Sequence, residues 1–237
     1  MKIALISDIH GNFPALEAVY HSINEKGIYE IFNLGDSLYG PLWPEETAQF
    51  LLKNNIKSIM GNQDEDLIND KPKNETEKYT LSQLSKSSID WLKTLPKIIQ
   101  KENITLFHGT FYSNREYLLE NIFQGNIYIK NNNEILEKIK NIDSKYIGFG
   151  HSHLERILTI NEKILINAGS VGLPAFSDDD PIHNIETFNN FAKYVLINDQ
   201  SIEIINVEYD HKSACKRAMD NNRNDWYVCL KNGRVIG

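Results

Sequence analysis

Short apolar runs alternate with amphipathic segments along the first part of the chain. Three runs have the length typical of buried strands, at residues 2–7, 29–34 and 56–60. Two segments between them carry apolar side chains at helical spacing, at residues 12–27 and 44–55. The first of these has Asn12 in the N-cap position and Gly27 at its end. The alternation predicts a sheet with helices packed outside it.

The pattern changes further along the chain. Residues 66–80 are polar and rich in Asn and Lys, which predicts an exposed loop, and residues 81–95 predict a helix that Pro96 ends. Three strands and one helix follow, with the strands at 98–101, 103–107 and 145–149 and the helix at 133–140. Two hairpins are predicted next, at 156–167 with the turn Asn161-Glu162, and at 191–207. Consecutive strands of this kind predict antiparallel additions that form a second layer.

The last segment, residues 211–237, combines a short helical stretch with an Asn232-Gly233 pair that predicts a hairpin turn. Asp178-Asp179-Asp180-Pro181 is the sharpest loop signal, but no linker or internal repeat divides the chain. We therefore expect one domain over residues 1–210, with 211–237 as its extension. The extension could pack on its own domain or on a second copy of the chain, and the sequence leaves both open.

Composition narrows the class of protein. The chain has 237 residues, of which 41% are hydrophobic and 24% charged, as in soluble globular domains. No apolar stretch reaches the roughly 18 residues of a membrane span, and the apolar start runs into Asp8 without a cleavage site. A net charge of −7 disfavours nucleic acid and membrane partners, although bound cations would still permit a phosphate substrate. Cys215 and Cys229 match no metal or redox spacing, which predicts reduced thiols in a cytoplasmic protein.

Residues of metal-ligand type recur directly after the apolar runs. Five segments have this form: Asp8-Ile9-His10, Gly35-Asp36, Gly61-Asn62-Gln63-Asp64, His108-Gly109 and Gly150-His151-Ser152-His153. Ligands bind at strand ends in open α/β sheets, and carboxylate, amide and imidazole groups suit divalent metals. Each residue alone also fits a structural role, so the joint pattern carries the hypothesis of a metal site. The other three histidines, His21, His183 and His211, are interpreted as structural.

Taken in order, these motifs resemble those of the calcineurin-like metallophosphoesterases, especially the bacterial branch that begins with Ser-Asp-Ile-His-Gly-Asn. Residues 39–41, 81–96 and 166–172 extend the resemblance to about residues 1–207. It implies a four-layer αββα sandwich of two mixed sheets flanked by helices. It also implies metal-dependent hydrolysis of a phosphoester in a small phosphorylated substrate. A phosphodiester is favoured over a phosphomonoester.

By position, the resemblance implies two divalent ions. Asp8, His10 and His153 would hold one, Asn62, His108 and His151 the other, and Asp36 would bridge them. The mixed nitrogen and oxygen donors suit Mn, Fe, Co, Ni or Zn better than Ca. Two such ions can generate a hydroxide and neutralise the phosphoryl oxygens during in-line displacement. Asn12, at a helix N-terminus, is a candidate for contact with a phosphate oxygen as well as an N-cap.

Gln63 departs from the family pattern. Many members have a histidine there, which binds phosphate or protonates the leaving group with the next acid, here Asp64. Glutamine donates a hydrogen bond but gives up no proton near neutral pH. Because some small bacterial phosphodiesterases also lack this histidine, the resemblance predicts an active enzyme. It would favour good leaving groups, or rely on Asp64 or water for protonation.

Three alternatives remain open beside the phosphodiesterase: a phosphomonoesterase, a nuclease, and a metal-binding regulatory protein with little turnover. The negative net charge of the chain and the lack of Lys/Arg clusters near the motifs weigh against a nuclease. Substrate determinants are expected in loops at 40–43, 111–117 and 176–184. Aromatic residues in or beside these loops could stack on a base or pack locally, namely Tyr39, Trp43, Phe111, Tyr112 and Phe176.

Overall fold

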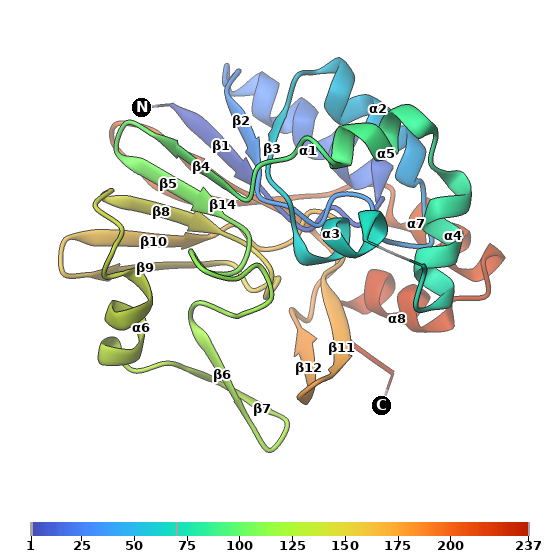
Figure 1. Cartoon of the computed structure of the whole chain (residues 1–237). Coiled ribbons are helices and arrows are strands. Elements are labelled where there is room, and N and C mark those ends of the chain that lie inside the picture. The colour runs from blue at the N-terminus through green and yellow to red at the C-terminus, as the bar shows by residue number, and fades with distance from the viewer. Residues whose placement is uncertain (1, 70, 237) are drawn as a thin grey trace.

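The computed structural model describes residues 2–69 and 71–236, so residue 70 of the predicted loop and residue 237 of the predicted extension lie outside the described residues. Two five-stranded mixed sheets form its centre (Figure 1). The first has the order β14 (Ile202–Val207), β13 (Ala192–Ile197), β1 (Ile3–Ile6), β2 (Ile31–Asn33) and β3 (Lys57–Ser58). The second has the order β4 (Ile98–Lys101), β5 (Ile104–Phe107), β8 (Tyr146–Phe149), β10 (Lys163–Asn167) and β9 (Arg156–Ile160).

Strand β1 explains how the apolar runs produce two layers of core. Its side chains alternate, so that Ile3 and Leu5 pack between the two sheets while Ala4 and Ile6 pack against helix α1 (Phe13–Glu25). A run that is apolar at every position is therefore buried on both faces. Asn12 caps α1, as predicted, by accepting a hydrogen bond from the backbone N–H of Ala15.

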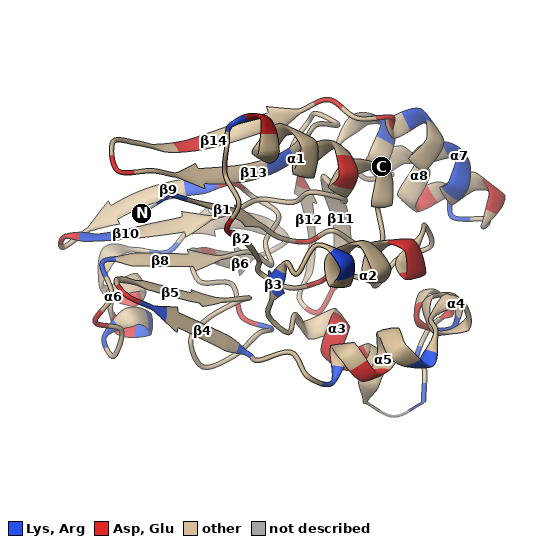
Figure 2. Cartoon of the chain, turned by 90° about the horizontal axis from the view of Figure 1, so that it is seen from above, with Lys and Arg blue, Asp and Glu red and all other residues tan. Residues whose placement is uncertain are grey.

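Helix α6 (Asn132–Ile139) covers the outer face of the second sheet, where its Ile135 and Ile139 join a core cluster with Ile147 and Leu165. Helix, sheet, sheet and helix therefore follow one another, which confirms the predicted four-layer αββα sandwich. Figure 2 shows the charged residues on the outer elements, while strands such as β1 and β8 carry none.

Two predictions in the region of residues 62–95 are wrong. Much of the predicted loop at 66–80 is helical, because α3 (Asn62–Ile68) and α4 (Glu75–Gln83) extend into it. The predicted helix at 81–95 breaks after α4, and α5 (Lys86–Leu92) begins again behind Ser85, whose hydroxyl accepts a hydrogen bond from Ser88 N–H. These helices are short and partly exposed, so their polar composition resembles that of a loop. The helix predicted at 44–55 is present as α2 (Pro44–Lys53).

Both predicted hairpins are confirmed as β9–β10 and β13–β14. Asn161 and Glu162 both have positive φ, as a tight two-residue hairpin turn requires. Two further hairpins were not predicted, β6 (Glu120–Phe123) with β7 (Asn126–Ile129) and β11 (Ala175–Asp179) with β12 (Ile182–Glu186). Part of the acidic segment at 178–181 lies on β11, and the rest forms the turn of that hairpin.

The C-terminal extension folds onto its own chain as α7 (His211–Asp220) and α8 (Asn224–Asn232). The predicted hairpin at Asn232-Gly233 is wrong. Gly233 instead ends α8 with a φ of 63°, and its N–H donates to the carbonyl of Cys229 at 2.8 Å. Glycine adopts this left-handed conformation readily, so the same residue pair serves a hairpin or a helix end. Apolar residues of both helices pack with Leu42 and Leu173.

None of the described helices is long and apolar enough to span a membrane.

Candidate metal centre

The predicted ligand segments meet at one edge of the two sheets. Strands β1, β2 and β3 run parallel in the first sheet, and β5, β8 and β10 run parallel in the second, so their carboxyl ends open together. The side chains that follow them form two groups, in each of which the potential ligand atoms lie within 4.8 Å of one another. The groups are Asp8, His10 and His153, and Asp36, His108 and His151.

Five of these residues have a strained backbone: φ is 54° at Asp8, 53° at His10, 52° at Asp36, 69° at His151 and 56° at His153. A left-handed conformation costs a non-glycine residue roughly 1–2 kcal/mol. Glycine would remove that cost but would also remove the side chain. Strain of this kind concentrates at functional sites, where the surrounding structure holds it in place. Backbone hydrogen bonds do so here, from Asp8 N–H to Gly35 and from His10 N–H to Asp36.

Steric crowding explains why glycine stands next to two of the ligand segments. A Cβ on Gly61 would lie 2.1 Å from Asp36 Oδ1, and one on Gly150 would lie 1.9 Å from Ser7 Oγ. Neither position could accept a larger residue without moving a strand-end loop. The close approach also lets the backbone N–H of His151 donate to Asp8 Oδ2 at 3.0 Å, which joins the two sheets at the site.

Three of the histidines direct a lone pair into the site. The Nδ1 atoms of His10, His108 and His153 lie 3.0, 2.7 and 2.6 Å from backbone carbonyl oxygens. A carbonyl only accepts, so each Nδ1 carries a proton, and each ring in its neutral, metal-binding form has its lone pair on Nε2. Orientation of this kind by a backbone carbonyl is usual for metal-binding histidines.

The donor set fits divalent cations. The Nε2 atoms of His10 and His153 lie 3.1 Å apart, and Asp8 Oδ1 lies 3.3 Å from that of His153. Asp8 Oδ1 is buried and accepts no hydrogen bond. In the second group, His108 Nε2 lies 3.3 Å from Asp36 Oδ2 and 3.0 Å from Asn62 Oδ1. Facing lone pairs beside an unpaired carboxylate oxygen are the arrangement that a cation stabilises.

The electrostatics favour the same interpretation. Burial, reinforced by a neighbouring histidine, lowers the pKa of both His10 and His151 to about 4, so these rings are neutral and able to bind metal near pH 7. Burial opposes charge at His108 as well, but Asp36 outweighs it and raises the pKa of His108 to about 9. His108 lowers the pKa of Asp36 in turn, although burial opposes this. Metal binding would displace the proton of His108.

Of the remaining predicted residues, Gln63 reaches the cavity that opens over the two ligand groups, whereas Asp64 and Asn12 do not. The backbone N–H of Gln63 donates to Asp36 Oδ1 at 2.9 Å. Its side chain lines the cavity, and the side-chain Oε1 is buried without a protein partner. Asp64 is fully buried and points away, where it accepts hydrogen bonds from the N–H groups of Ser37 and Leu38 at 2.9 and 3.2 Å. Asp64 therefore holds the loop that carries Asp36, and it does not line the cavity.

Asn12 is likewise fully buried and lies outside the cavity lining. Its amide donates to the carbonyl of Gly172 at 2.8 Å and to the hydroxyl of Tyr209 at 3.2 Å. Its backbone N–H donates to the carbonyl of Ile9. These bonds account for its polar groups, so the geometry supports the N-cap role and brings none of them to a phosphate.

A cavity of about 300 Å³ opens over the two groups. Of the five aromatic candidates, Tyr39 and Phe176 line it, whereas Trp43, Phe111 and Tyr112 are not part of its lining. Tyr117 and Asp178 also line the cavity and lie in loops that were expected to carry substrate determinants, whereas the lining residues Arg223 and Trp226 were not predicted. They belong to no motif, and only the packing of distant segments brings them to the site.

His183, which the sequence suggested to be merely structural, lies close behind this cavity. It is buried, and its Nε2 lies 2.9 Å from the hydroxyl of Tyr117. Its Nδ1 donates to the carbonyl of Pro181 at 2.6 Å, so Nε2 accepts the hydrogen bond from Tyr117. The Tyr117 ring in turn lies 4.8 Å from the ring of His151. This pair fixes one wall beside the candidate ligands.

Comparison with known proteins identifies the family. Residues 1–187 match the calcineurin-like phosphoesterase superfamily domain. The chain belongs to this superfamily. It is 30% identical over 251 aligned positions to the uncharacterized protein MJ0912 of Methanocaldococcus jannaschii, with 94% of each chain covered. It is 24% identical to the phosphodiesterase YfcE of Escherichia coli, with 85% of this chain and 95% of YfcE covered.

Solved structures agree on the calcineurin-like fold. A metallophosphoesterase from Sphaerobacter thermophilus superposes with a TM-score of 0.77 at 22% identity, covering 98% of this chain and 99% of that one. The hypothetical protein PH1004 from Pyrococcus horikoshii gives 0.77 at 19% identity, covering 99% of both. Membership of the superfamily supports hydrolysis of a phosphoester and the use of divalent metals, without specifying which metal.

Proposed function

We propose that this calcineurin-like phosphoesterase hydrolyses a small phosphodiester with two divalent metal ions. The observation that carries the proposal is the convergence of histidine rings on two buried carboxylates at the carboxyl ends of strands β1, β2, β5 and β8. Asp8, His10 and His153 would hold one ion, and Asn62, His108 and His151 the other, with Asp36 as the bridging ligand. Bound metals of this kind activate water near neutral pH and neutralise charge on the phosphoryl group.

The chain's own residues would position the substrate. The Gln63 amide faces the cavity with an unsatisfied oxygen, and rotation about its last bond exchanges that oxygen for an NH₂ donor. As a donor it would hold a phosphoryl oxygen, but it has no proton to give the leaving group. Since Asp64 is engaged with backbone N–H groups, the site favours esters whose leaving group needs little protonation.

Size and charge favour a small substrate over nucleic acid. The cavity of about 300 Å³ accommodates a phosphate with a modest organic group. Arg223 is the only Lys or Arg among the described residues that line it, whereas a nuclease needs several cations along a strand. The complete donor set beside an open cavity also favours turnover over a purely regulatory role.

The test is reconstitution of the metal-free chain with Mn²⁺, followed by assays on bis(p-nitrophenyl) phosphate, p-nitrophenyl phosphate and single-stranded DNA. We expect metal-dependent hydrolysis with the diester preferred. Asp36→Asn should lower the rate by more than roughly 100-fold. A loss above this value exceeds the effect of removing a group that only orients a metal ligand. Asp90→Asn, on the surface of α5, is the matched control. Cleavage of DNA alone would favour a nuclease, and no turnover with metal bound would favour a regulatory protein.

A further inference from the structure

Helix α8 and the residues after it reach the cavity, although they lie beyond the matched residues 1–187. Trp226 of α8 is 6% exposed, and its ring lies 6.0 Å from the ring of His10 in an edge-to-face arrangement. A Cβ on Gly40 would lie 2.9 Å from the Trp226 ring, so a glycine at this position is what admits the indole. Trp226 is therefore built into the site beside a candidate metal ligand.

Other apolar groups complete a wall with Trp226. The ring of Phe176, on β11, lies 4.6 Å from the ring of His153, and Phe176 packs against the apolar cluster that contains Trp226. Val235 and Ile236 follow α8 and line the same cavity. The cavity thus has a polar floor at the candidate metal ligands and an apolar wall that is contributed largely by the C-terminal segment and β11.

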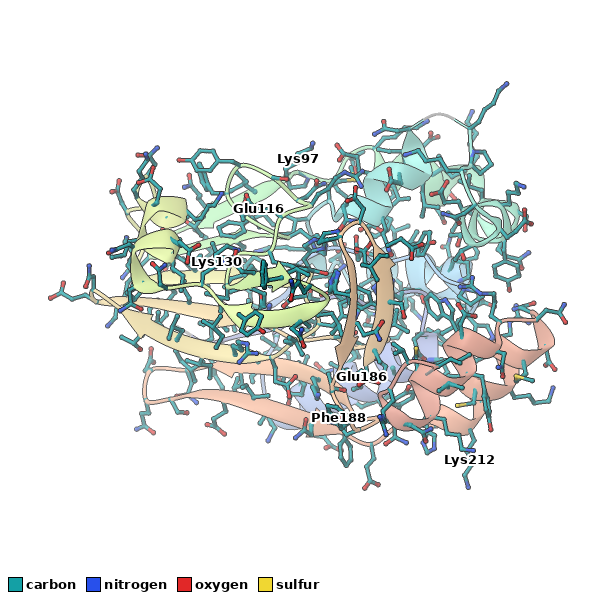
Figure 3. The ribbon with its side chains drawn as sticks, turned by 90° about the horizontal axis from the view of Figure 1, so that it is seen from below. Lys97, Glu116, Lys130, Glu186, Phe188 and Lys212 are labelled. Atoms are coloured by element: carbon teal, nitrogen blue, oxygen red, sulfur yellow. The ribbon has the colours of Figure 1, made fainter. Side chains whose placement is uncertain are left out.

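This segment is fastened at two points that Figure 3 labels, Glu186 at the end of β12 and Phe188 just beyond it. The backbone N–H of Val235 donates to Glu186 Oε1 at 2.9 Å. The Arg234 guanidinium lies 5.4 Å from the ring of Phe188, whose N–H donates to the carbonyl of Gly233. These contacts hold Val235 and Ile236 against the cavity.

The positive charge that Arg223 brings to the wall is already paired. The Arg223 guanidinium lies 2.5 Å from Asp225 Oδ2 and also donates to Thr76 Oγ1. No other Lys or Arg lines the cavity within the described ranges, so the wall offers no free cation for further phosphate groups. This chemistry disfavours a polyphosphate and favours an uncharged organic group.

We propose that Trp226, Phe176, Val235 and Ile236 form a subsite for an apolar or aromatic organic group esterified to the phosphate. The inference rests on the proposed function, because it assumes that a phosphoryl group binds at the metal centre. Helix α8, the residues after it and β11 then determine which phosphoesters are bound tightly, while the strand-end residues supply the chemistry common to all of them.

Calorimetric binding of phenylphosphonate and methylphosphonate to the Mn²⁺-loaded full chain tests the subsite, since the two probes differ only in the organic group. Burial of the larger apolar surface should make phenylphosphonate bind roughly 10–100-fold more tightly. Trp226→Ala should reduce this ratio to less than about threefold, because it removes contacts that only the phenyl group makes. Tyr227→Ala is the matched control, because Tyr227 lies next to Trp226 on α8 but does not line the cavity.

Trp226 is buried, so a second variant guards against a folding defect. Val235→Ser combined with Ile236→Ser alters residues after the last helix, one of them 51% exposed, and should lower the ratio in the same way. Equal affinities in the wild type, or an unchanged ratio in the folded variants, would overturn the subsite. A retained ratio without diester hydrolysis would overturn the proposed function alone, and hydrolysis without a ratio would overturn the subsite alone.

Discussion

The Nε2 atoms of His10 and His153 face each other at 3.1 Å, although both rings carry their proton on Nδ1. Both side chains are buried, so water cannot separate the two lone pairs. Such a pair is unfavourable by itself and becomes favourable when a cation lies within reach of both nitrogens. The same relationship therefore links the stability of the protein to metal binding.

Metal binding should raise the melting temperature. An ion present at about 100 times its dissociation constant stabilises the folded state by about 2.7 kcal/mol, which corresponds to roughly 5–10 °C for a domain of this size. Differential scanning calorimetry of chelator-treated protein, with and without Mn²⁺, measures the shift. His153→Ala should lose much of it, whereas His21→Ala, on the exposed face of α1, should keep it. An equal shift in both variants would exclude His153 as a ligand.

Replacing Gln63 by histidine should speed the hydrolysis of esters with poor leaving groups. General acid catalysis is worth roughly 10²–10⁴-fold. The gain should fall at the lower end, because Asp64 is bonded to Ser37 and Leu38 and cannot orient the new ring. Rates across a series of substituted aryl diesters measure it, with Gln49→His on the surface of α2 as control. Identical rates for wild type and Gln63→His across the series would remove residue 63 from the mechanism.

Asp64→Asn should destabilise the protein. One oxygen of the side chain becomes an NH₂ donor, so the buried N–H of Leu38, which bonds Oδ1, or that of Gly61, which bonds Oδ2, loses its acceptor, at a cost of roughly 1–3 kcal/mol. Urea unfolding measures the loss, with Asp90→Asn as the exposed control. The dependence of rate on leaving group should stay as in the wild type. If it steepens instead, Asp64 is the proton donor after all.

Glu120 should make stability depend on pH. Burial raises the pKa of this carboxyl group although Arg156 lies 3.3 Å away, and one carboxylate oxygen has no partner. A folded-state pKa above the unfolded value of 4.5 means that ionisation costs stability as the pH rises through that window. Glu120→Gln should therefore gain stability relative to the wild type as the pH rises above 4.5. Urea unfolding at several pH values tests this, with Glu137→Gln on α6 as control, and a constant difference would contradict it.

The fold was largely predictable because apolar periodicity fixes the positions of the strands, and strand order then brings their carboxyl ends together. Glycine beside Asp, Asn or His at five strand ends identified the candidate ligands, because each glycine is adjacent in sequence to a ligand-type residue. The positive φ of Asp8, His10 and Asp36 was not predictable, because the sequence alone favours glycine in that conformation.

The loops at 111–117 and 176–184 were expected to hold substrate determinants, but the contacts that build the cavity wall could not be predicted, for a different reason. Trp226 meets Gly40, and Tyr117 meets His183, through packing between segments that are far apart in the chain. No local pattern encodes such contacts. The β11–β12 hairpin was missed because its acidic segment has the composition of a loop, and the direction in which Asp64 points depends on the turn at Ser37.

The most direct test is a titration of Mn²⁺ into the metal-free chain, with bound metal and hydrolysis of bis(p-nitrophenyl) phosphate measured on the same samples. The two ligand groups predict that binding saturates at two ions per chain and that hydrolysis rises mainly with the second. Saturation at one ion, full activity with one ion, or hydrolysis without metal would contradict a dinuclear centre.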